Sequence, residues 1–341
     1  MTQQYRVAIA GCHRMLDRTP ANHNFATAFD ADAETEIVAV FDLGDETRKA
    51  FLECWGAGVA AYDGFGAMLR QERPDILCLA TSQKMHADQI EEAVAAGVRG
   101  ILSDKPLATS LEEADRLLDA CRGAGVPLAF GLDRRWLSSY RRLAELVRDG
   151  IVGELQSVIV FGIPNLINHG CHWYDAALQL VGDREPEWVS GLVEEVAGEP
   201  PDSRRRMDPT GRLMVGLAGG VVLYFTLGGS RRPSFEIVGD QGRLTVVEDG
   251  GQAWQWQESG APQPLDIPQP TGDFPSGMAM VRDLVEAVAG GGRTACDVEE
   301  ARRATEIGFA AHLSHAQGGA RIELPAGDRT LRIPSFPWGN E

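Results

Sequence analysis

The chain has 341 residues, 44% hydrophobic and 24% charged, which is ordinary for a globular protein long enough to hold two domains. Its formal net charge of −17 argues against nucleic acid and anionic membranes as partners. No stretch approaches the ~18 apolar residues of a membrane span, the N-terminus lacks a signal-peptide pattern, and the six cysteines are scattered without metal-ligand spacing. We therefore expect a cytoplasmic protein with reduced thiols and no metal site.

The first 130 residues alternate short apolar runs with amphipathic, helix-like stretches. One such stretch begins at Ser110, where Glu113 completes a capping box. This alternation predicts an α/β domain in which helices cover both faces of a doubly wound parallel sheet. The expected strands lie at 6–11, 36–42, 75–81, 100–102 and 126–130.

Ligands of such sheets bind beyond the carboxyl ends of the strands. Gly11, Asp42, Thr81 and Lys105 all fall at these ends, so we expect them to lie near one another and to form the site.

The loop after the first strand departs from the dinucleotide pattern G-x-G-x-x-G. It reads Gly11-Cys12-His13-Arg14-Met15-Leu16 and keeps only the first glycine. One interpretation is that Arg14 or Arg18 binds phosphate directly, because arginine pairs readily with phosphate. The other is that cofactor affinity is weak or lost. We expect Pro20 to open the following helix at its first turn.

Asp42 ends the second strand, where an acid can accept a hydrogen bond from a ribose 2′-hydroxyl and would repel a 2′-phosphate. This favours NAD over NADP. An aspartate in this position can also be only a turn or cap residue, and the nearby Arg48 leaves NADP possible.

Lys105 is one of three lysines among the 32 basic residues, and it directly follows a buried strand. Arginine cannot exchange a proton near neutral pH, whereas lysine can when burial or neighbours lower its pKa. A surface ion pair is the alternative. The position at a strand exit favours proton exchange.

From about residue 153 the pattern changes to strands joined by short turns. The turns Ala218-Gly219-Gly220 and Gly239-Asp240-Gln241-Gly242 predict two hairpins. This is typical of an α+β domain with a mainly antiparallel sheet, and we expect its open face to join subunits in a homodimer or homotetramer. Trp338 in the tail is expected to pack on a neighbouring subunit or over the active cleft. We expect strands near 156–161, 213–217, 221–227, 235–238 and 244–247, helices near 173–181, 278–289 and 299–315, and domains at 1–132 and 133–325 with a tail at 326–341.

A polar cluster that includes Asn168, His169, His172 and Asp175 enters an otherwise apolar helix. Zinc ligation would need a second cluster, which the sequence does not supply. Asp175 can reach an imidazole on the same helical face or cap the helix. A histidine beside a lysine at a nicotinamide site would be a proton-transfer pair.

Taken together, these segments resemble the Gfo/Idh/MocA oxidoreductases, which include glucose–fructose oxidoreductase and inositol dehydrogenase. Five motifs occur in the family's order over nearly the whole chain. The motifs E-K-P, T-P-N-x-x-H, G-H-N-R-R-F/W, G-x-H-x-x-D and I-x-G-x-x-G are matched by 104–106, 81–86, 131–136, 170–175 and 237–242.

The resemblance implies a Rossmann domain that binds NAD, with NADP less favoured, and a second domain that holds a sugar, sugar acid or cyclitol. It implies Lys105 and His172 as the catalytic proton-transfer pair. Asn168 occupies the family's third catalytic position, usually an aspartate; an amide can orient a hydroxyl but cannot act as a base. Cofactor contacts are expected at Gly11, His13, Arg14, Met15, Asp42, Thr81, Ser82, His86, Asp104 and Lys105, and substrate contacts at Lys105, Arg135, Trp136, Asn168 and His172.

The leading expectation is an NAD(P)-dependent oxidoreductase that acts on CH–OH groups. One alternative is a redox-neutral epimerase, lyase or glycosidase that keeps its NAD tightly bound. The other is a non-catalytic module that binds the cofactor, suggested by the lost glycines and by Asn168. The very short segment 162–167 prevents the substrate of any well-known family member from being carried over.

Overall fold

The computed structural model describes residues 4–21, 23–56, 58–162, 165–194, 208–226 and 232–333, so Trp338 lies outside the described residues. The chain forms two compact units. Unit 1 comprises Met1–Thr109, Glu113–Trp136 and Thr271–Arg302, and unit 2 comprises Ser110–Glu112, Leu137–Pro270 and Arg303–Glu341.

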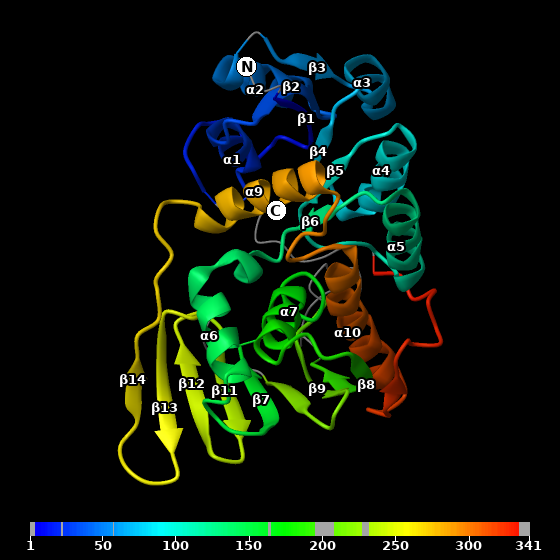
Figure 1. Cartoon of the computed structure of the whole chain (residues 1–341). Helices are drawn as coiled ribbons and strands as arrows, with labels where there is room; N and C mark the ends of the chain where they lie inside the picture. The colour runs from blue at the N-terminus through cyan, green and yellow to red at the C-terminus, as the bar shows by residue number, and fades with distance from the viewer. Residues whose placement is uncertain are drawn as a thin grey trace. The chain divides into compact units, whose positions relative to one another are not determined.

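Unit 1 is built on a parallel sheet of six strands within the described residues, in the order β3-β2-β1-β4-β5-β6 (Figure 1). The order reverses between β1 and β4, which makes this the doubly wound nucleotide-binding topology. The predicted parallel sheet is therefore confirmed. Its strands are β1 (Tyr5–Ala10), β2 (Thr35–Phe41), β3 (Ala60–Tyr62), β4 (Ile76–Leu79), β5 (Gly100–Ser103) and β6 (Leu128–Phe130).

Helices cover the sheet of unit 1 because its central strands are buried almost throughout. At the start of α5, the carboxylate of Glu113 accepts hydrogen bonds from the backbone and the hydroxyl of Thr109, one residue before the predicted cap residue Ser110. The helices are α1 (Phe25–Ala31), α2 (Asp45–Trp55), α3 (Phe65–Glu72), α4 (Gln83–Ala95), α5 (Leu111–Ala124), the 3₁₀ turn η1 (Asp133–Trp136) and α9 (Pro275–Gly290).

The helix α9 belongs to unit 1, although the predicted boundary at 132/133 assigned it to the second domain. It packs on β5, where Gly100 has no side chain and Val288 and Leu284 fill the space. Arg282 also pairs with Asp32 and Glu34 in the α1–β2 turn, at 3.3 and 3.0 Å. Residues 271–302 thus complete the first domain, in which α9 lies against β5 and β6 (Figure 1).

Unit 2 is built on a mixed, mainly antiparallel sheet of nine strands within the described residues. Both predicted hairpins are confirmed, with β9 paired to β10 and β11 paired to β12. Among the strand pairs that the structure describes in this sheet, β7 and β10 are the parallel pair and the others are antiparallel. In sheet order the strands are β14 (Gln263–Leu265), β13 (Gln252–Gln257), β12 (Gly242–Val247), β11 (Ser234–Gly239), β7 (Leu155–Phe161), β10 (Val222–Thr226), β9 (Gly211–Leu217), β8 (Pro186–Val193) and β15 (Ile322–Glu323).

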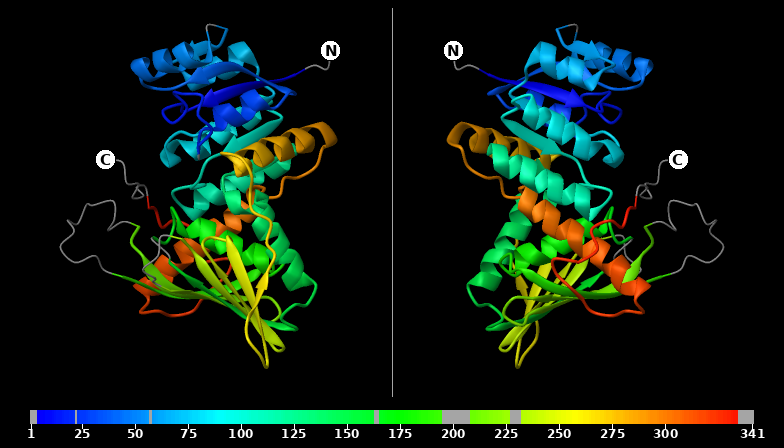
Figure 2. Two further views of the ribbon diagram at one scale, coloured as in Figure 1. Left: turned by 90° about the vertical axis from the view of Figure 1, so that its left-hand side faces the viewer. Right: turned by 90° about the vertical axis from the view of Figure 1, so that its right-hand side faces the viewer.

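The helices α6 (Ser138–Arg148), α7 (Gly170–Leu180) and most of α10 (Val298–Ala316) lie against one face of this sheet (Figure 2). Among the residues that the structure describes, no helix lies on the other face. The uncovered face exposes large apolar side chains. Phe161, Met214 and Tyr224 are 37%, 39% and 38% exposed, and Tyr224 is paired with Met214 across β10 and β9. The predicted open sheet face is therefore present.

No helix among the described residues is long and apolar enough to cross a membrane. The same described residues contain no group of three or more His, Cys, Asp or Glu side chains that could hold a metal ion.

Candidate functional site

The carboxyl ends of β1, β2, β4 and β5 meet at one edge of the unit 1 sheet. Backbone hydrogen bonds join them in series: the N–H of Gly11 donates to Phe41 at 2.8 Å, Ala80 to Ala10 at 2.8 Å, and Asp104 to Leu79 at 2.8 Å. The strand-end residues predicted to gather, Gly11, Asp42, Thr81 and Lys105, therefore do lie at one edge.

Gly11 is placed where the sheet order reverses, and its backbone touches the end of β4. A β-carbon at this position would lie 2.6 Å from the carbonyl carbon and oxygen of Ala80 and 2.7 Å from the nitrogen of Thr81. Its φ of +82° is also a conformation that glycine adopts freely. Gly11 thus lets β1 pack closely against β4 at the strand ends where sheets of this topology bind a dinucleotide.

Asp42 binds the backbone on both sides of the site. Its Oδ2 accepts a hydrogen bond from the N–H of Cys12 at 3.0 Å, and its Oδ1 accepts one from Gly44 at 2.9 Å. A carboxylate has about four acceptor positions, so capacity remains for hydroxyl groups of a ligand. Burial, with the charge of Asp42 adding to it, raises the pKa of the Cys12 thiol to about 12, which keeps this cysteine protonated and unreactive.

Arg48 has its own partners within unit 1. Its guanidinium donates to the carbonyl oxygen of Asp42 at 2.6 Å and to the carboxylate of Asp45 at 3.1 Å. These bonds hold the turn after β2 and give no support to a role in binding a 2′-phosphate.

The loop from Gly11 to α1 differs from its prediction at two points. Pro20 does not open the helix, because α1 begins only at Phe25, after Asn24. Arg18 donates to Asp30 at 2.9 Å and stacks on Trp55 at 4.5 Å. These contacts disfavour Arg18 as the phosphate ligand and leave Arg14, which is exposed, as the candidate.

The other predicted loop contacts differ in exposure. His13 is exposed and can reach a ligand. The side chain of Met15 is fully buried, and its carbonyl oxygen accepts a hydrogen bond from the indole nitrogen of Trp55 at 2.7 Å. Met15 can therefore contact a cofactor only through its backbone.

His86, on α4, ties the turns after β4 and β5 together. Its Nδ1 lies 2.9 Å from the carbonyl oxygen of Pro106, and its Nε2 lies 3.1 Å from that of Thr81. Burial lowers its pKa, against the opposing effect of these two carbonyls. Its 1% exposure points to positioning of the site, whereas Ser82 before it is exposed.

Asp104 and Lys105 follow β5 and are both buried, at 9% and 5% exposure. Asp104 receives a hydrogen bond from the backbone N–H of Lys105 at 2.8 Å. His23, from the loop before α1, places its Nδ1 at 2.9 and 3.1 Å from the two carboxylate oxygens. Burial alone would raise the pKa of Asp104, but His23 and Lys105 outweigh it and hold this pKa well below its usual range.

Arg135 and Trp136, predicted to contact substrate, are buried in unit 1 at 5% and 4% exposure. The indole of Trp136 donates to Asp283 on α9 at 2.9 Å, and Arg135 donates to the carbonyl oxygen of Ala295 at 3.4 Å. These contacts join η1 to residues 271–302. A role in substrate binding stays a prediction.

In unit 2, the segment before α7 carries Asn168, and the helix itself carries His172. Asn168 is fully buried and His172 is half-buried. The buried carboxylate of Asp208 accepts hydrogen bonds from the backbone N–H groups of Ile167 and Asn168 at 2.8 and 2.9 Å. Asp175 lies within α7, so the predicted option that it caps this helix is wrong.

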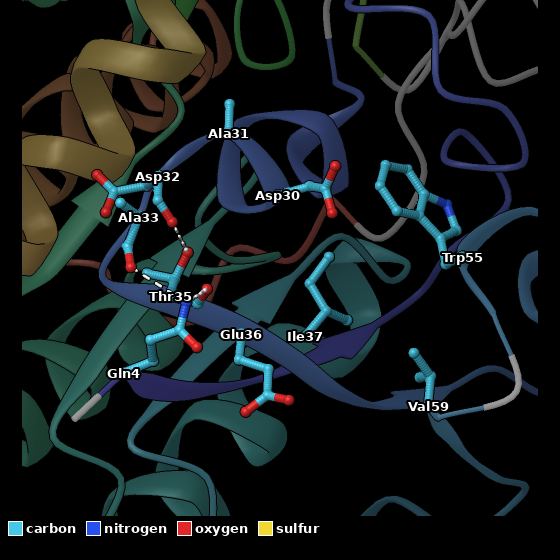
Figure 3. A pocket seen from close by; sticks show the side chains of 10 residues that line it. All are labelled: Gln4, Asp30, Ala31, Asp32, Ala33, Thr35, Glu36, Ile37, Trp55 and Val59. Atoms are coloured by element: carbon cyan, nitrogen blue, oxygen red, sulfur yellow. Dashed lines mark hydrogen bonds between the residues drawn. The ribbon is translucent and has the colours of Figure 1, made fainter. Parts of the chain in front are cut away.

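A hollow in unit 1 lies away from these residues, at the start of β2 and next to the end of α1 (Figure 3). Its volume is about 510 Å³, and its lining includes Asp30, Glu36 and Trp55. This is the amino end of the strand, so the hollow is separate from the edge that carries Gly11 and Asp42.

Comparison with known families decides the nature of this domain. Residues 5–132 match the GFO_IDH_MocA model, described as an oxidoreductase family with an NAD-binding Rossmann fold. The match covers less than half of the chain and shows that residues 5–132 form a domain of the Gfo/Idh/MocA type. The matched residues include every strand of the unit 1 sheet, which agrees with the strand order and with the position of Gly11.

Relatives and solved structures extend the comparison. The chain is 28% identical over 196 residues to D-glucoside 3-dehydrogenase of Escherichia coli, covering 52% of this chain and 54% of the relative. It spans about half the length of the curated relatives it matches. An oxidoreductase from Agrobacterium radiobacter, solved with NAD⁺, L-tartaric acid and magnesium, matches with TM-score 0.79 and 16% identity over 95% of this chain and 99% of its own.

A 3-ketoreductase from Actinomadura kijaniata, solved with NADP, matches with TM-score 0.75 and 20% identity over 92% of this chain and 98% of its own. At these identities the two solved structures show the fold alone. They extend the fold assignment to both units of the chain.

Sequence reasoning missed two residues that contact the candidate site residues. His23 and Asp208 both stand in stretches of sequence with no periodic pattern of apolar residues, so neither had a local signal. Each contacts a residue more than 35 positions away, which a single sequence does not reveal.

Proposed function

We propose that the chain is an NAD(P)-dependent oxidoreductase that transfers a hydride between nicotinamide and a hydroxyl or carbonyl carbon of a sugar, sugar acid or cyclitol. The observation that carries the proposal is the position of Gly11 where the strand order reverses. The missing side chain of Gly11 lets the end of β1 pack against Ala80, and the loop that follows begins where sheets of this topology bind a dinucleotide. The family match over residues 5–132 supports the same cofactor class.

NAD is the proposed cofactor, in preference to NADP. The carboxylate of Asp42 is fixed by the backbones of Cys12 and Gly44, so it would present a negative charge to the ribose at a constant place. A ribose 2′-hydroxyl can donate to that charge, whereas a 2′-phosphate would be repelled. The bonds of Arg48 to Asp42 and Asp45 agree with this preference.

Lys105 and His172 are the proposed proton-transfer groups, and Asn168 the group that orients the substrate hydroxyl. When bound, the nicotinamide accepts or supplies the hydride. In the oxidative direction, the Nζ of Lys105 or the imidazole of His172 takes the hydroxyl proton as the carbon–oxygen double bond forms. In the reductive direction the same group returns it. Because Lys105 is buried, it would exchange its proton with the substrate hydroxyl and not with bulk water.

The substrate class rests on the names of relatives, several of which, like that of D-glucoside 3-dehydrogenase, specify carbon 3 of a sugar. Glucosides are therefore the first substrates to screen. The net charge of −17 argues against electrostatic attraction of strongly anionic substrates, although a local basic group could still bind one.

We further propose a homodimer or homotetramer that forms through the uncovered face of the unit 2 sheet. The exposed Phe161, Met214 and Tyr224 on this face support the proposal, because such apolar groups commonly mark an interface. The six free cysteines support the proposal of a reducing, cytoplasmic location.

The test is formation of NADH from NAD by the purified protein with a panel of glucosides, free sugars, sugar acids and cyclitols. The wild type should turn over at least one of them, and His172→Gln should reduce kcat with little effect on NAD affinity. A substrate consumed without net NADH, together with NAD that co-purifies, would favour the redox-neutral alternative. Binding of NAD without turnover of any kind would favour the non-catalytic module.

A further inference from the structure

We propose that His23 is a positioning residue for Lys105, acting through the carboxylate of Asp104. The inference rests on the proposed catalytic role of Lys105 and extends it to a residue of the loop before α1. The loop that lacks the second and third glycines of the phosphate-binding pattern would then contact, through His23, the residue next to the proposed catalytic lysine.

The geometry of one carboxylate carries the inference. Both oxygens of Asp104 lie within 3.1 Å of the Nδ1 of His23, and Oδ1 also accepts the backbone N–H of Lys105. Asp104 is 9% exposed, so water cannot readily replace either partner. The single side chain of Asp104 therefore links the loop of His23 to the backbone of Lys105.

The backbone of His23 shows that the loop is shaped for this contact. Its φ is +69°, in the left-handed region that non-glycine residues rarely adopt and that histidine tolerates better than most. The neighbouring Asn24 is 2% exposed, and its amide donates to the carbonyl oxygens of Asp17 and Thr19 at 3.0 Å each. Hydrogen bonds of Asn24 within the loop thus fix the chain next to His23, and His23 itself binds Asp104.

Through the charge of Asp104, the contact between His23 and Asp104 should affect the pKa of Lys105. The titratable groups that feel the charge of Asp104 include His23 from the loop, Lys105 beside it, His86 from α4 and Cys78 from β4. With His23 bound, the carboxylate shares its negative charge between a donor on the loop and Lys105. Without His23, more of that charge would stabilise the ammonium of Lys105 and would raise its pKa, leaving less free amine to accept a proton.

Competitive labelling of amines with acetic anhydride tests the proposal without any substrate. The chain has three lysines, and Lys49 and Lys84 are exposed, so they serve as internal references in mass spectrometry of the labelled peptides. The rate of Lys105 labelling against pH gives its pKa in the wild type and in each variant.

Two variants distinguish the effect of the hydrogen-bond donor of His23 from the effect of its backbone conformation. His23→Gly removes the donor but accepts a φ of +69°, whereas His23→Asn keeps both a donor and tolerance of that φ. We expect Lys105 to label about tenfold more slowly in His23→Gly at a pH below its pKa, the size of effect that one nearby charge commonly has. In His23→Asn the rate should stay close to that of the wild type.

Two comparisons exclude loss of loop order as the cause. Arg18→Ala removes a different anchor of the loop, the pair with Asp30, without touching Asp104, and it should leave the pKa of Lys105 unchanged. In Asp104→Asn, adding His23→Gly should change Lys105 no further, because the carboxylate through which His23 acts is absent.

Equal labelling of Lys105 in the wild type and in His23→Gly would overturn the proposal, as would an equal effect of Arg18→Ala. If a substrate is found, the kcat–pH profile of His23→Gly should move in the same direction as the pKa of Lys105. If no turnover is found, the labelling result still decides the role of His23, while the proposed function fails separately.

Discussion

Gly11 and Ala80 lie so close that a β-carbon on Gly11 would be 2.6 Å from the carbonyl carbon of Ala80. This contact joins the ends of β1 and β4, where the order of the parallel sheet reverses. It explains why this glycine is kept while the other two positions of the phosphate pattern hold His13 and Leu16. The first position is required by the fold itself, whereas the other two concern the ligand and the helix that follows.

Gly11→Ala should therefore lower both stability and nucleotide affinity. The positive φ alone should cost about 1–3 kcal/mol of unfolding free energy, and the contact with Ala80 adds to it. Chemical denaturation measures the loss. As a matched control, Gly123→Ala in α5, with nothing within 4 Å, should be neutral or stabilising by up to about 1 kcal/mol. A stable Gly11→Ala protein with unchanged nucleotide affinity would contradict the requirement for glycine at this position.

Lys105→Arg should abolish turnover while the protein stays folded. Arginine keeps the positive charge but cannot give up its proton near neutral pH. We expect kcat to fall by about a hundredfold or more, the usual contribution of a general acid or base. The measurement is NADH formation with the best substrate of the panel, with NAD affinity and Tm as controls. Activity close to that of the wild type would remove Lys105 from the proton-transfer step.

Asp42→Asn should shift the cofactor preference. Loss of the charge should weaken NAD binding by about tenfold, as expected for one hydrogen bond to a charged group, and should relieve the repulsion of a 2′-phosphate. Fluorescence titration with NAD and NADP gives the ratio of the two dissociation constants. Because Asp42 also holds the backbones of Cys12 and Gly44, both affinities can fall. An unchanged ratio would leave Asp42 with only that backbone role.

His86 should make the protein less stable as the pH falls below about 6.5, the pKa of an unfolded histidine. Burial lowers its pKa in the folded state, so in this range the unfolded chain binds more protons. Asp104 acts in a lower window, because its depressed pKa stabilises the fold above about pH 3.9, and that stability is lost only on further acidification.

Melting curves between pH 7.5 and 5.5 test the assignment to His86. The wild type should lose Tm across this range, and His86→Gln should lose less, although it starts from a lower Tm. The exposed His315 provides the control, since His315→Gln should follow the wild type. Parallel curves for the wild type and His86→Gln would assign the pH dependence to another group.

Met214→Glu should reduce the molar mass of the protein in solution. Met214 faces Tyr224 on the uncovered side of the unit 2 sheet, so a charge there would be buried in any interface formed by this face. Light scattering should show a dimer or tetramer for the wild type and a smaller species for the variant. Leu43→Glu, at a side chain 72% exposed in unit 1, should change nothing. A monomeric wild type would refute the interface.

Most of the fold could be predicted from the sequence because its signals are local. The apolar runs became β1, β2, β4, β5 and β6, and the glycine turns became hairpins. The boundary of the first domain could not be predicted, because α9 joins unit 1 through contacts such as Val288 on Gly100, made from far along the chain. The spacing of apolar residues predicts that one face of a helix is apolar. It does not indicate which sheet that face will cover.

The candidate site was predictable to the same extent. Residues at strand ends were brought together by the parallel topology, as Gly11 and Asp42 show. The irregular loop before α1 was not, since its path depends on Arg18 meeting Asp30 and on His23 meeting Asp104. Propensity placed a helix start at Pro20, but the tertiary contacts of the loop delay that helix to Phe25.

The most direct test of the central claim is titration of the purified protein with NAD and NADP, together with mass spectrometry of the protein as isolated. We expect NAD to bind with a micromolar or lower dissociation constant, more tightly than NADP, and Gly11→Ala to weaken it. Absence of binding by either nucleotide, with none co-purifying, would contradict the proposal that this Rossmann domain serves a nicotinamide-dependent enzyme.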